Sequence, residues 1–85
     1  MHVAGVLVRT RPEDIDAVSS ALRRLEGVEV HAATPDGRFI VTVEATESGH
    51  AAARFADLQL LPFVLSAALV YEHSETDPGR WREEP

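Results

Sequence analysis

The middle of the chain decides its fold: residues 28–45 read VEVHAATPDGRFIVTVEA. Residues 28–32 and residues 38–45 both alternate apolar and polar side chains, which predicts two β-strands, each with one covered face. Between them, Pro35 fixes φ and Gly37 accepts a positive φ, a combination typical of a tight turn. The stretch therefore predicts an antiparallel β-hairpin.

An amphipathic helix is predicted on the N-terminal side of this hairpin. Thr10 and Glu13 have the spacing of a capping box, and Pro12 suits a first helical turn because it has no N–H to satisfy. Gly27 is predicted to end the helix with a positive φ. The apolar side chains between these signals recur at intervals of three and four and share one helical face: Ile15, Val18, Leu22 and Leu25.

The C-terminal side of the hairpin predicts a second helix and a last strand. Ser48 is the predicted helix cap and Pro62 the predicted stop. Residues 64–72 predict the last strand, and residues 3–9 predict the first. The apolar stripe of the second helix is weaker than that of the first: Ala51, Phe55, Leu58 and Leu61.

The order of these elements is βαββαβ, which predicts an α+β ferredoxin-like sandwich. Its sheet would be four-stranded and antiparallel, with two helices on one face. We assign residues 1–73 to this domain. Residues 74–85 are polar and rich in turn formers, so we expect a flexible polar tail. Trp81 in that tail is expected to be a mobile tail aromatic, and the alternative is that it docks on the open sheet face of its own or a neighbouring chain.

Strand alternation sorts the sheet residues into two faces. The helix-covered face is predicted to hold the large apolar side chains: Val6, Val8, Val28, Val30, Phe39, Val41, Val43, Leu65, Leu69 and Tyr71. The open face mixes small, polar and apolar side chains: Gly5, Leu7, Arg9, Glu29, His31, Arg38, Ile40, Thr42, Glu44, Ser66, Ala68 and Val70.

The centre of the open face is predicted to be apolar and its rim charged, which is a common sign of a binding surface. Small side chains at Gly5, Ser66 and Ala68 would let a partner's backbone approach closely. The rim carboxylates expected to meet a basic partner are Glu29, Glu44 and Glu72. An ordinary solvated face, or one buried in a homodimer, remains the alternative.

Composition narrows the class of protein. The 85 residues suffice for one domain, and 45% of them are apolar. The net charge is −6, and the basic residues are eight arginines without a lysine. This charge disfavours nucleic acid as a partner and favours basic partners. The alternative is that the charge only keeps a small domain soluble. No apolar stretch reaches membrane-helix length and no basic signal region opens the chain, so we expect a cytoplasmic protein without membrane insertion.

Catalytic, metal and cofactor sites are not expected. The absence of cysteine excludes disulfides and thiolate chemistry. The carboxylates show no context that implies burial, and neither a nucleophile elbow nor a phosphate loop occurs. The histidines match no compact ligand spacing for a metal: His2, His31, His50 and His73.

Four stretches carry a resemblance to a known family. They are residues 5–9 (GVLVR), 25–31 (LEGVEVH), 37–44 (GRFIVTVE) and, most specific, 61–73 (LPFVLSAALVYEH). On these residues the chain resembles the NapD family over about residues 6–75. One departure is Phe63, which stands where such sequences usually carry glycine after the proline, and which should change the turn into the last strand.

The resemblance implies a cytoplasmic chaperone of the periplasmic nitrate reductase, and no enzyme activity. Such chaperones bind the twin-arginine signal peptide of the catalytic subunit, in helical form on the sheet surface, and delay export until its molybdenum cofactor is inserted. We expect a monomer or weak dimer. The alternative is a ferredoxin-like regulatory domain that binds a metabolite at a dimer interface. The predicted peptide-binding residues are Gly5, Leu7, Arg9, Glu29, Ile40, Thr42, Glu44, Ser66, Ala68 and Val70.

Overall fold

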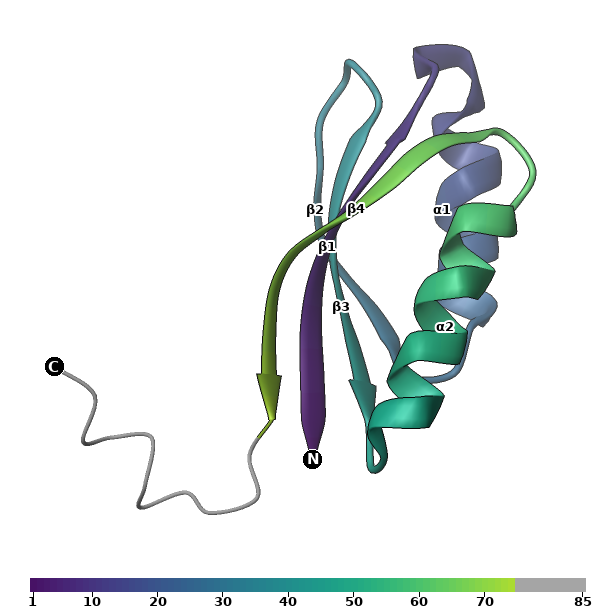
Figure 1. The fold of residues 1–85 in the computed structure, drawn as a ribbon. Helices are drawn as coiled ribbons and strands as arrows, with labels where there is room; N and C mark the ends of the chain where they lie inside the picture. Colours follow the sequence, from purple (N-terminus) through teal and green to yellow (C-terminus); the bar gives the residue numbers. More distant parts are fainter. Residues whose placement is uncertain (75–85) are drawn as a thin grey trace, which may run out of the picture.

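The computed structural model describes residues 1–74 and confirms the predicted ferredoxin-like architecture. The sheet is antiparallel with strand order β2-β3-β1-β4, and both helices lie on one side of it (Figure 1). The predicted tail, including Trp81, lies outside the described residues apart from Ser74, the last residue of β4. The elements are β1 (His2–Thr10), the 3-10 turn η1 (Pro12–Asp14), α1 (Ile15–Arg24), β2 (Val28–Ala33), β3 (Arg38–Ala45), α2 (Ser48–Leu60) and β4 (Val64–Ser74).

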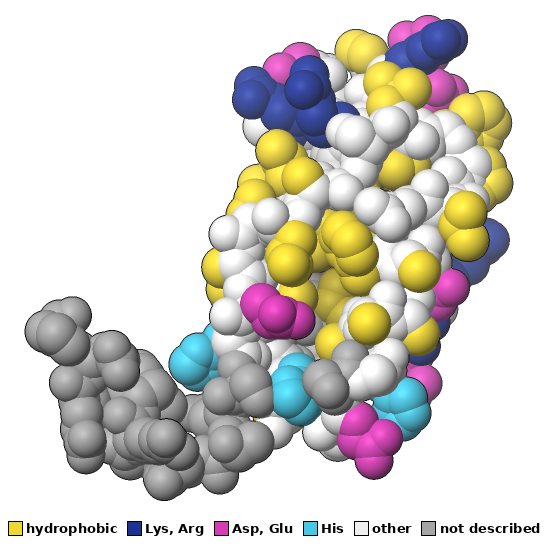
Figure 2. Space-filling view, in the orientation of Figure 1, with side chains coloured by type: hydrophobic (Ala, Val, Ile, Leu, Met, Phe, Trp, Pro, Cys, Tyr) yellow, Lys and Arg dark blue, Asp and Glu magenta, His cyan; other side chains and the backbone are white. Residues whose placement is uncertain are grey.

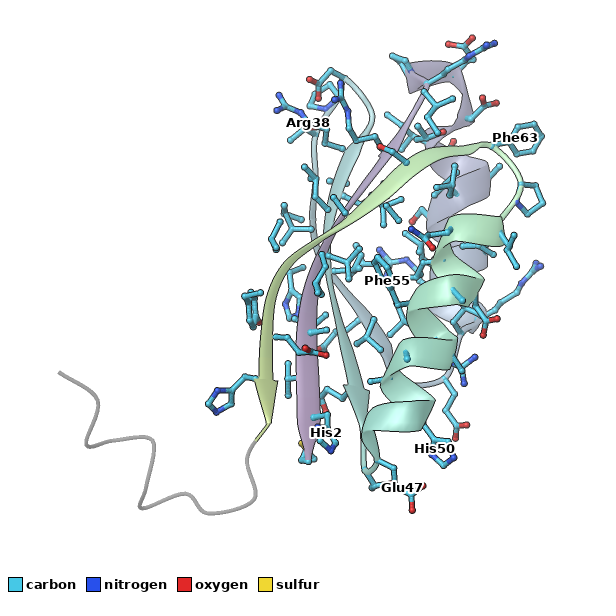
Figure 3. The ribbon with its side chains drawn as sticks, viewed as in Figure 1. His2, Arg38, Glu47, His50, Phe55 and Phe63 are labelled. Atoms are coloured by element: carbon cyan, nitrogen blue, oxygen red, sulfur yellow. The ribbon has the colours of Figure 1, made fainter. Side chains whose placement is uncertain are left out.

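Both predicted helical stripes face the core. Val18 and Leu22 of α1 are fully buried, and Ile15 and Leu25 pack against the same cluster. Figure 3 labels Phe55, which α2 contributes to the layer between helix and sheet. The other three stripe residues of α2 are buried or half-buried: Ala51, Leu58 and Leu61.

The two central strands, β1 and β3, follow the predicted alternation without a break. Their register runs unshifted from the pair His2 and Ala45 to the pair Arg9 and Arg38. One side chain in two therefore enters the core. The fully buried ones are Val6, Val8, Phe39, Val41 and Val43.

The edge strand β4 departs from the predicted alternation. Its register shifts twice against β1, between Gly5 and Val6 and between Arg9 and Thr10. Each shift inserts an unpaired residue, which is the pattern of a β-bulge. The core therefore receives Val64 and Ala67 from β4. The core prediction is wrong for three residues, which are exposed instead, with these exposed fractions: Leu65 (62%), Leu69 (49%) and Tyr71 (51%).

The physical reason differs among these three residues. Leu65 is the unpaired residue between the pairs Arg9–Ser66 and Thr10–Val64. Leu69 lies opposite the buried Val6, so it points to the covered side, but β4 is the last strand and α2 leaves it half uncovered. The bulge at Val70 turns Tyr71 to the open face.

The predicted capping signals are displaced by a few residues. Thr10 ends β1 and is nearly fully buried, and its Oγ1 donates a hydrogen bond to the Phe63 carbonyl oxygen (2.6 Å). It therefore forms no capping box with Glu13. Pro12 does begin the first turn, as predicted. At the second helix, Glu47 occupies the cap position and Ser48 is already helical.

Both glycines predicted at turns have a positive φ. Gly27 has φ of 81°, as predicted, but it does not end the helix, because α1 ends at Arg24 with Leu25 as its cap. Gly37 has φ of 96° in the β2–β3 hairpin. A Cβ atom at Gly37 would also overlap the Thr10 carbonyl oxygen, and backbone cannot move aside for it. Only glycine fits this position, so the hairpin turn locks against the end of β1.

Candidate functional site

The open face of the sheet carries a row of four apolar side chains across all four strands. In register order they are Ala32 of β2, Ile40 of β3, Leu7 of β1 and Ala68 of β4. Residues directly opposite one another point to the same face. Ile40 is 44% exposed and Leu7 is half-buried, so the row is accessible. We call these four residues the apolar row.

One end of the open face is basic. Arg38 of β3, Arg9 of β1 and Ser66 of β4 lie opposite one another, and we call them the basic row. The Arg9 guanidinium is exposed and makes no hydrogen bond or ion pair with the described residues. In the space-filling view, a group of Lys/Arg side chains lies at the end of the molecule where Figure 3 labels Arg38 (Figure 2).

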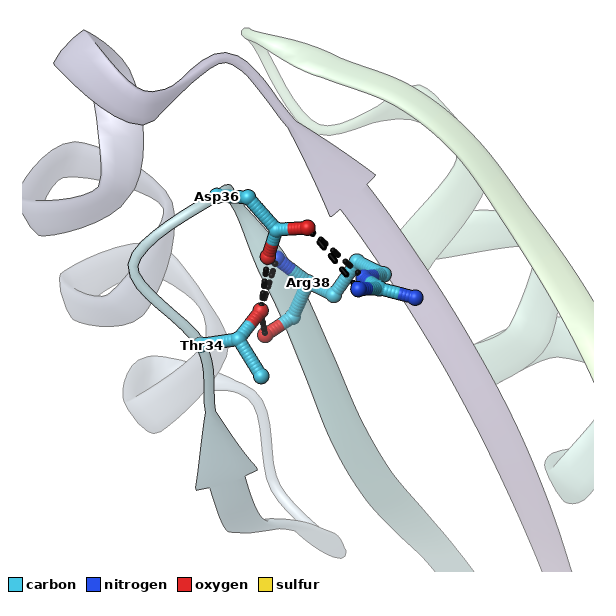
Figure 4. Close-up of polar contacts among 3 residues, drawn as sticks. All are labelled: Thr34, Asp36 and Arg38. Atoms are coloured by element: carbon cyan, nitrogen blue, oxygen red, sulfur yellow. Dashed lines mark hydrogen bonds and ion pairs between the residues drawn. The ribbon is translucent and has the colours of Figure 1, made fainter.

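Arg38 is held by the hairpin turn. Its Nε and Nη2 donate to Asp36 Oδ2 at 3.1 and 2.8 Å (Figure 4). Thr34 Oγ1 donates to the other carboxylate oxygen of Asp36. The Thr34 hydrogen bond first, and then the Arg38 contacts, lower the pKa of Asp36 below its usual value. Arg38 is thus partly neutralised, and Arg9 is the free cation of the basic row within residues 1–74.

The row on the other side of the apolar row is polar. It runs through Glu29, Thr42, Gly5 and Tyr71. His31, the unpaired residue of the β2 bulge, joins it: its Nε2 lies 2.8 Å from Thr42 Oγ1 and 3.6 Å from Glu29 Oε1. We call these five residues the polar row.

The Tyr71 side chain covers Gly5, where the sequence predicted space for a partner. A Cβ atom on Gly5 would overlap the Tyr71 ring, so the ring lies against the backbone of Gly5. Gly5 is buried and leaves no room for a partner's backbone, contrary to expectation. A glycine inside a strand is a signal of close approach, and here the approaching group is the protein's own tyrosine.

The far end of the open face is acidic. Glu44 of β3 is exposed and lies opposite Val3, which in turn lies opposite His73 of β4. We call Glu29 and Glu44 together the acidic end. A hollow of about 240 Å³ lies between these two glutamates, lined by Gly27, Val28, Glu29 and Glu44.

A larger hollow adjoins the acidic end, on the side of the β3–α2 connection. It measures about 480 Å³ and shares Glu44 with the smaller one. Arg54 on its wall is paired with Asp57 at 2.8 Å, and His50 lies 3.8 Å from Glu47. Its lining residues are Glu26, Gly27, Glu44, Ala45, Thr46, His50 and Arg54.

The ten predicted site residues all lie on strands of the sheet, but the exposure of their side chains differs. Gly5 is covered, while Val70, at the β4 bulge, is 56% exposed. The bulges add Ala32 and Tyr71, which alternation had not placed there. Glu72, considered as a rim carboxylate, lies opposite the buried Ala4 and so belongs to the covered side.

The open face has the layout of a binding surface. Among residues 1–74, no group of three histidine or acidic side chains could hold a metal ion. No helix in the same range has the length and apolar character needed to cross a membrane. On a ferredoxin-like sheet that the helices leave uncovered on one face, an apolar row between a basic row and a polar row is typical of a polypeptide-binding surface.

Comparisons with known proteins name the family. The family model described as NapD protein matches residues 1–76, so the chain belongs to the NapD family. The solution structure of the E. coli Tat proofreading chaperone protein NapD is similar, with 30% sequence identity and a TM-score of 0.78. That match covers 88% of this chain and 80% of the E. coli chain.

A second similar structure is a transcriptional regulatory protein of the AsnC family from Pyrococcus furiosus. It has 22% identity and a TM-score of 0.69, and the match covers 93% of this chain and 55% of that one. This likeness shows the fold alone. A search of the curated proteins finds no match.

Proposed function

We propose that this chain is a cytoplasmic chaperone for the catalytic subunit of the periplasmic nitrate reductase. It binds the twin-arginine signal peptide of that subunit and delays export until the molybdenum cofactor is inserted. Membership of the NapD family supports this role, as does the similarity to a Tat proofreading chaperone. The observation that carries the proposal is the apolar row on an uncovered sheet face, with the basic row on one side and the polar row and the acidic end on the other.

The chemistry of a twin-arginine signal matches this face. Such a signal has a basic segment followed by an apolar one. As an amphipathic helix, the apolar segment would pack on Ile40, Leu7 and Ala68. Burying about 300 Å² of apolar surface would stabilise the complex by roughly 7 kcal/mol before the costs of association. Charged contacts at the rim set the rate of encounter and the register more than the affinity.

The chaperone action follows from occupancy. While the peptide lies on the sheet, the export machinery has no access to it. The two binding events compete, so the delay depends on the affinity and the concentration of the chaperone. No bond is made or broken, and the proposed role is therefore non-enzymatic.

Isothermal titration calorimetry with the synthetic signal peptide tests the proposal. We expect a dissociation constant below about 30 μM, equivalent to roughly −6 kcal/mol or stronger. A peptide that fails to bind in this range would contradict the proposed function. The same peptide with both arginines replaced by glutamine serves as the reference for the charged contribution.

Substitutions on the apolar row test which face binds. Ala68→Glu and Leu7→Glu should weaken binding by about 1–3 kcal/mol, because a charge then lies where an apolar contact forms. Leu60→Glu is the matched control, since Leu60 is 80% exposed on α2. Ala68 is exposed on an edge strand, so its variant remains informative if Leu7→Glu unfolds. Unchanged affinity in folded variants would show that another face binds.

The oligomeric state separates the proposal from the alternative of a metabolite-binding dimer. We expect a monomer or weak dimer in sedimentation velocity experiments, with the open face free for the peptide. A tight dimer that buries the open face, and that a metabolite stabilises, would favour the regulatory alternative.

A further inference from the structure

The open face is electrically asymmetric along the strands. Its acidic end holds Glu29 and Glu44, and its basic row holds Arg9 and Arg38, with the apolar row between them. We propose that a bound signal peptide lies along the strands in one direction only. Its paired arginines lie at the acidic end, and its helix C-terminus lies at the basic row. This inference rests on the proposed function and adds the direction of the peptide.

The length of the open face along the strands matches the length of a short peptide helix. Glu44 and Arg38 are six positions apart on β3, and at about 3.3 Å per residue they are separated by roughly 20 Å. A helix of about 13 residues has the same length, at 1.5 Å per residue. One short helix can therefore contact both charged ends and the apolar row at once.

Charge complementarity selects the direction. A helix carries partial positive charge at its N-terminus and partial negative charge at its C-terminus. In the proposed direction, the peptide arginines and the positive helix end meet Glu29 and Glu44. The C-terminal carbonyl groups meet Arg9, whose guanidinium has no partner within residues 1–74. In the opposite direction, every one of these contacts becomes repulsive.

The acidic end offers separate positions for two neighbouring guanidinium groups. Adjacent side chains on a helix diverge by about 100°, so two consecutive arginines do not reach the same spot. The hollow between Glu29 and Glu44 can receive one of them. The Tyr71 ring, half exposed over Gly5 in the neighbouring row, offers an aromatic surface on which the other can stack.

Paramagnetic relaxation experiments measure the direction. The chain has no cysteine, so a nitroxide on a cysteine at either end of the synthetic peptide is the only label in the complex. With ¹⁵N-labelled full-length chain, an N-terminal label should broaden the amide signals of Glu44 and Val3. A C-terminal label should broaden those of Arg9 and Arg38.

Other outcomes separate the inference from the proposed function. A reversed pattern, or equal broadening of both ends by both labels, overturns the inference while peptide binding stands. No binding in calorimetry removes the proposed function together with the inference.

Charge-removing variants give a second readout. Glu44→Gln should weaken binding of the native peptide about 3- to 10-fold at low salt, and less than about 2-fold for the peptide without its two arginines. Asp16→Asn, the same charge change at an exposed site on α1, should alter neither affinity. An equal loss for both peptides in Glu44→Gln, or tighter binding of the native peptide to Arg9→Gln, overturns the proposed direction.

Discussion

The central strands and the edge strands of this sheet follow different rules. β1 and β3 pair over eight residue pairs without a register shift. The edge strands β2 and β4 are both bulged, once at His31 and twice along β4. A central strand is constrained by partners on both sides, whereas an edge strand has one free side and tolerates an extra residue.

This difference explains how the candidate binding face is built. The central pair supplies its apolar centre, Ile40 and Leu7. The bulges supply groups that strict alternation would place elsewhere: Ala32 opposite Ile40, and Tyr71 over Gly5. Regular pairing builds the core, and irregular pairing adjusts the surface.

The largest expected effect compares one substitution in the two regions. Val41→Ala removes two methyl groups from a fully buried position in β3 and should lower the free energy of unfolding by about 2 kcal/mol. Val70→Ala at the β4 bulge, 56% exposed, should cost less than about 0.5 kcal/mol. Urea unfolding measures both variants. Equal losses would show that the bulged edge is as tightly packed as the centre.

The sequence predicted the element order, both helical stripes and the faces of the central strands. These features depend on the spacing of side chains along the chain. Val18 and Leu22, for example, are four residues apart, so they lie on one helical face and are buried together. The sequence misplaced Tyr71 because a bulge is set by pairing with a neighbouring strand, which a period of two along one strand does not encode. The same limit hid Ala32, whereas Gly5 inside a strand was a usable signal of close approach.

A second prediction concerns the contact that the β4 bulge creates. Gly5→Ala should lower stability by roughly 1–2 kcal/mol, because the new methyl group displaces the Tyr71 ring. In a Tyr71→Ala background the same change should cost almost nothing. The double-mutant cycle, measured by urea unfolding, should thus give a coupling free energy of roughly 1–2 kcal/mol. Additive effects would mean that the ring does not depend on Gly5.

The start of β4 holds the third contrast. Phe63 has φ of 72°, a conformation in which glycine costs least, and its half-exposed ring lies at the corner between α2 and β4 (Figure 3). Phe63→Gly should be more stable than Phe63→Ala by about 1 kcal/mol, because alanine keeps the steric cost of the left-handed region.

The comparison with alanine controls for loss of the ring in both variants. Thermal unfolding with the same buffer and scan rate measures the difference. A glycine variant no more stable than the alanine variant would mean that the turn relaxes to another conformation once the ring is gone.

The smallest effect lies where the edge strand β2 passes into the central strand β3. The hydrogen bond from Thr34, and then the contacts with Arg38, hold the pKa of Asp36 below its usual 3.8. A carboxyl whose folded pKa is depressed stabilises the fold above its unfolded pKa, and this contribution is lost as the pH falls through the folded pKa. Thr34→Val and Arg38→Gln should each raise the pKa of Asp36, because each removes a group that stabilises the ionised carboxylate. Carbon-detected NMR titration of the carboxylate measures both shifts, and an unchanged pKa in Thr34→Val would mean that the turn hydroxyl does not stabilise this carboxylate.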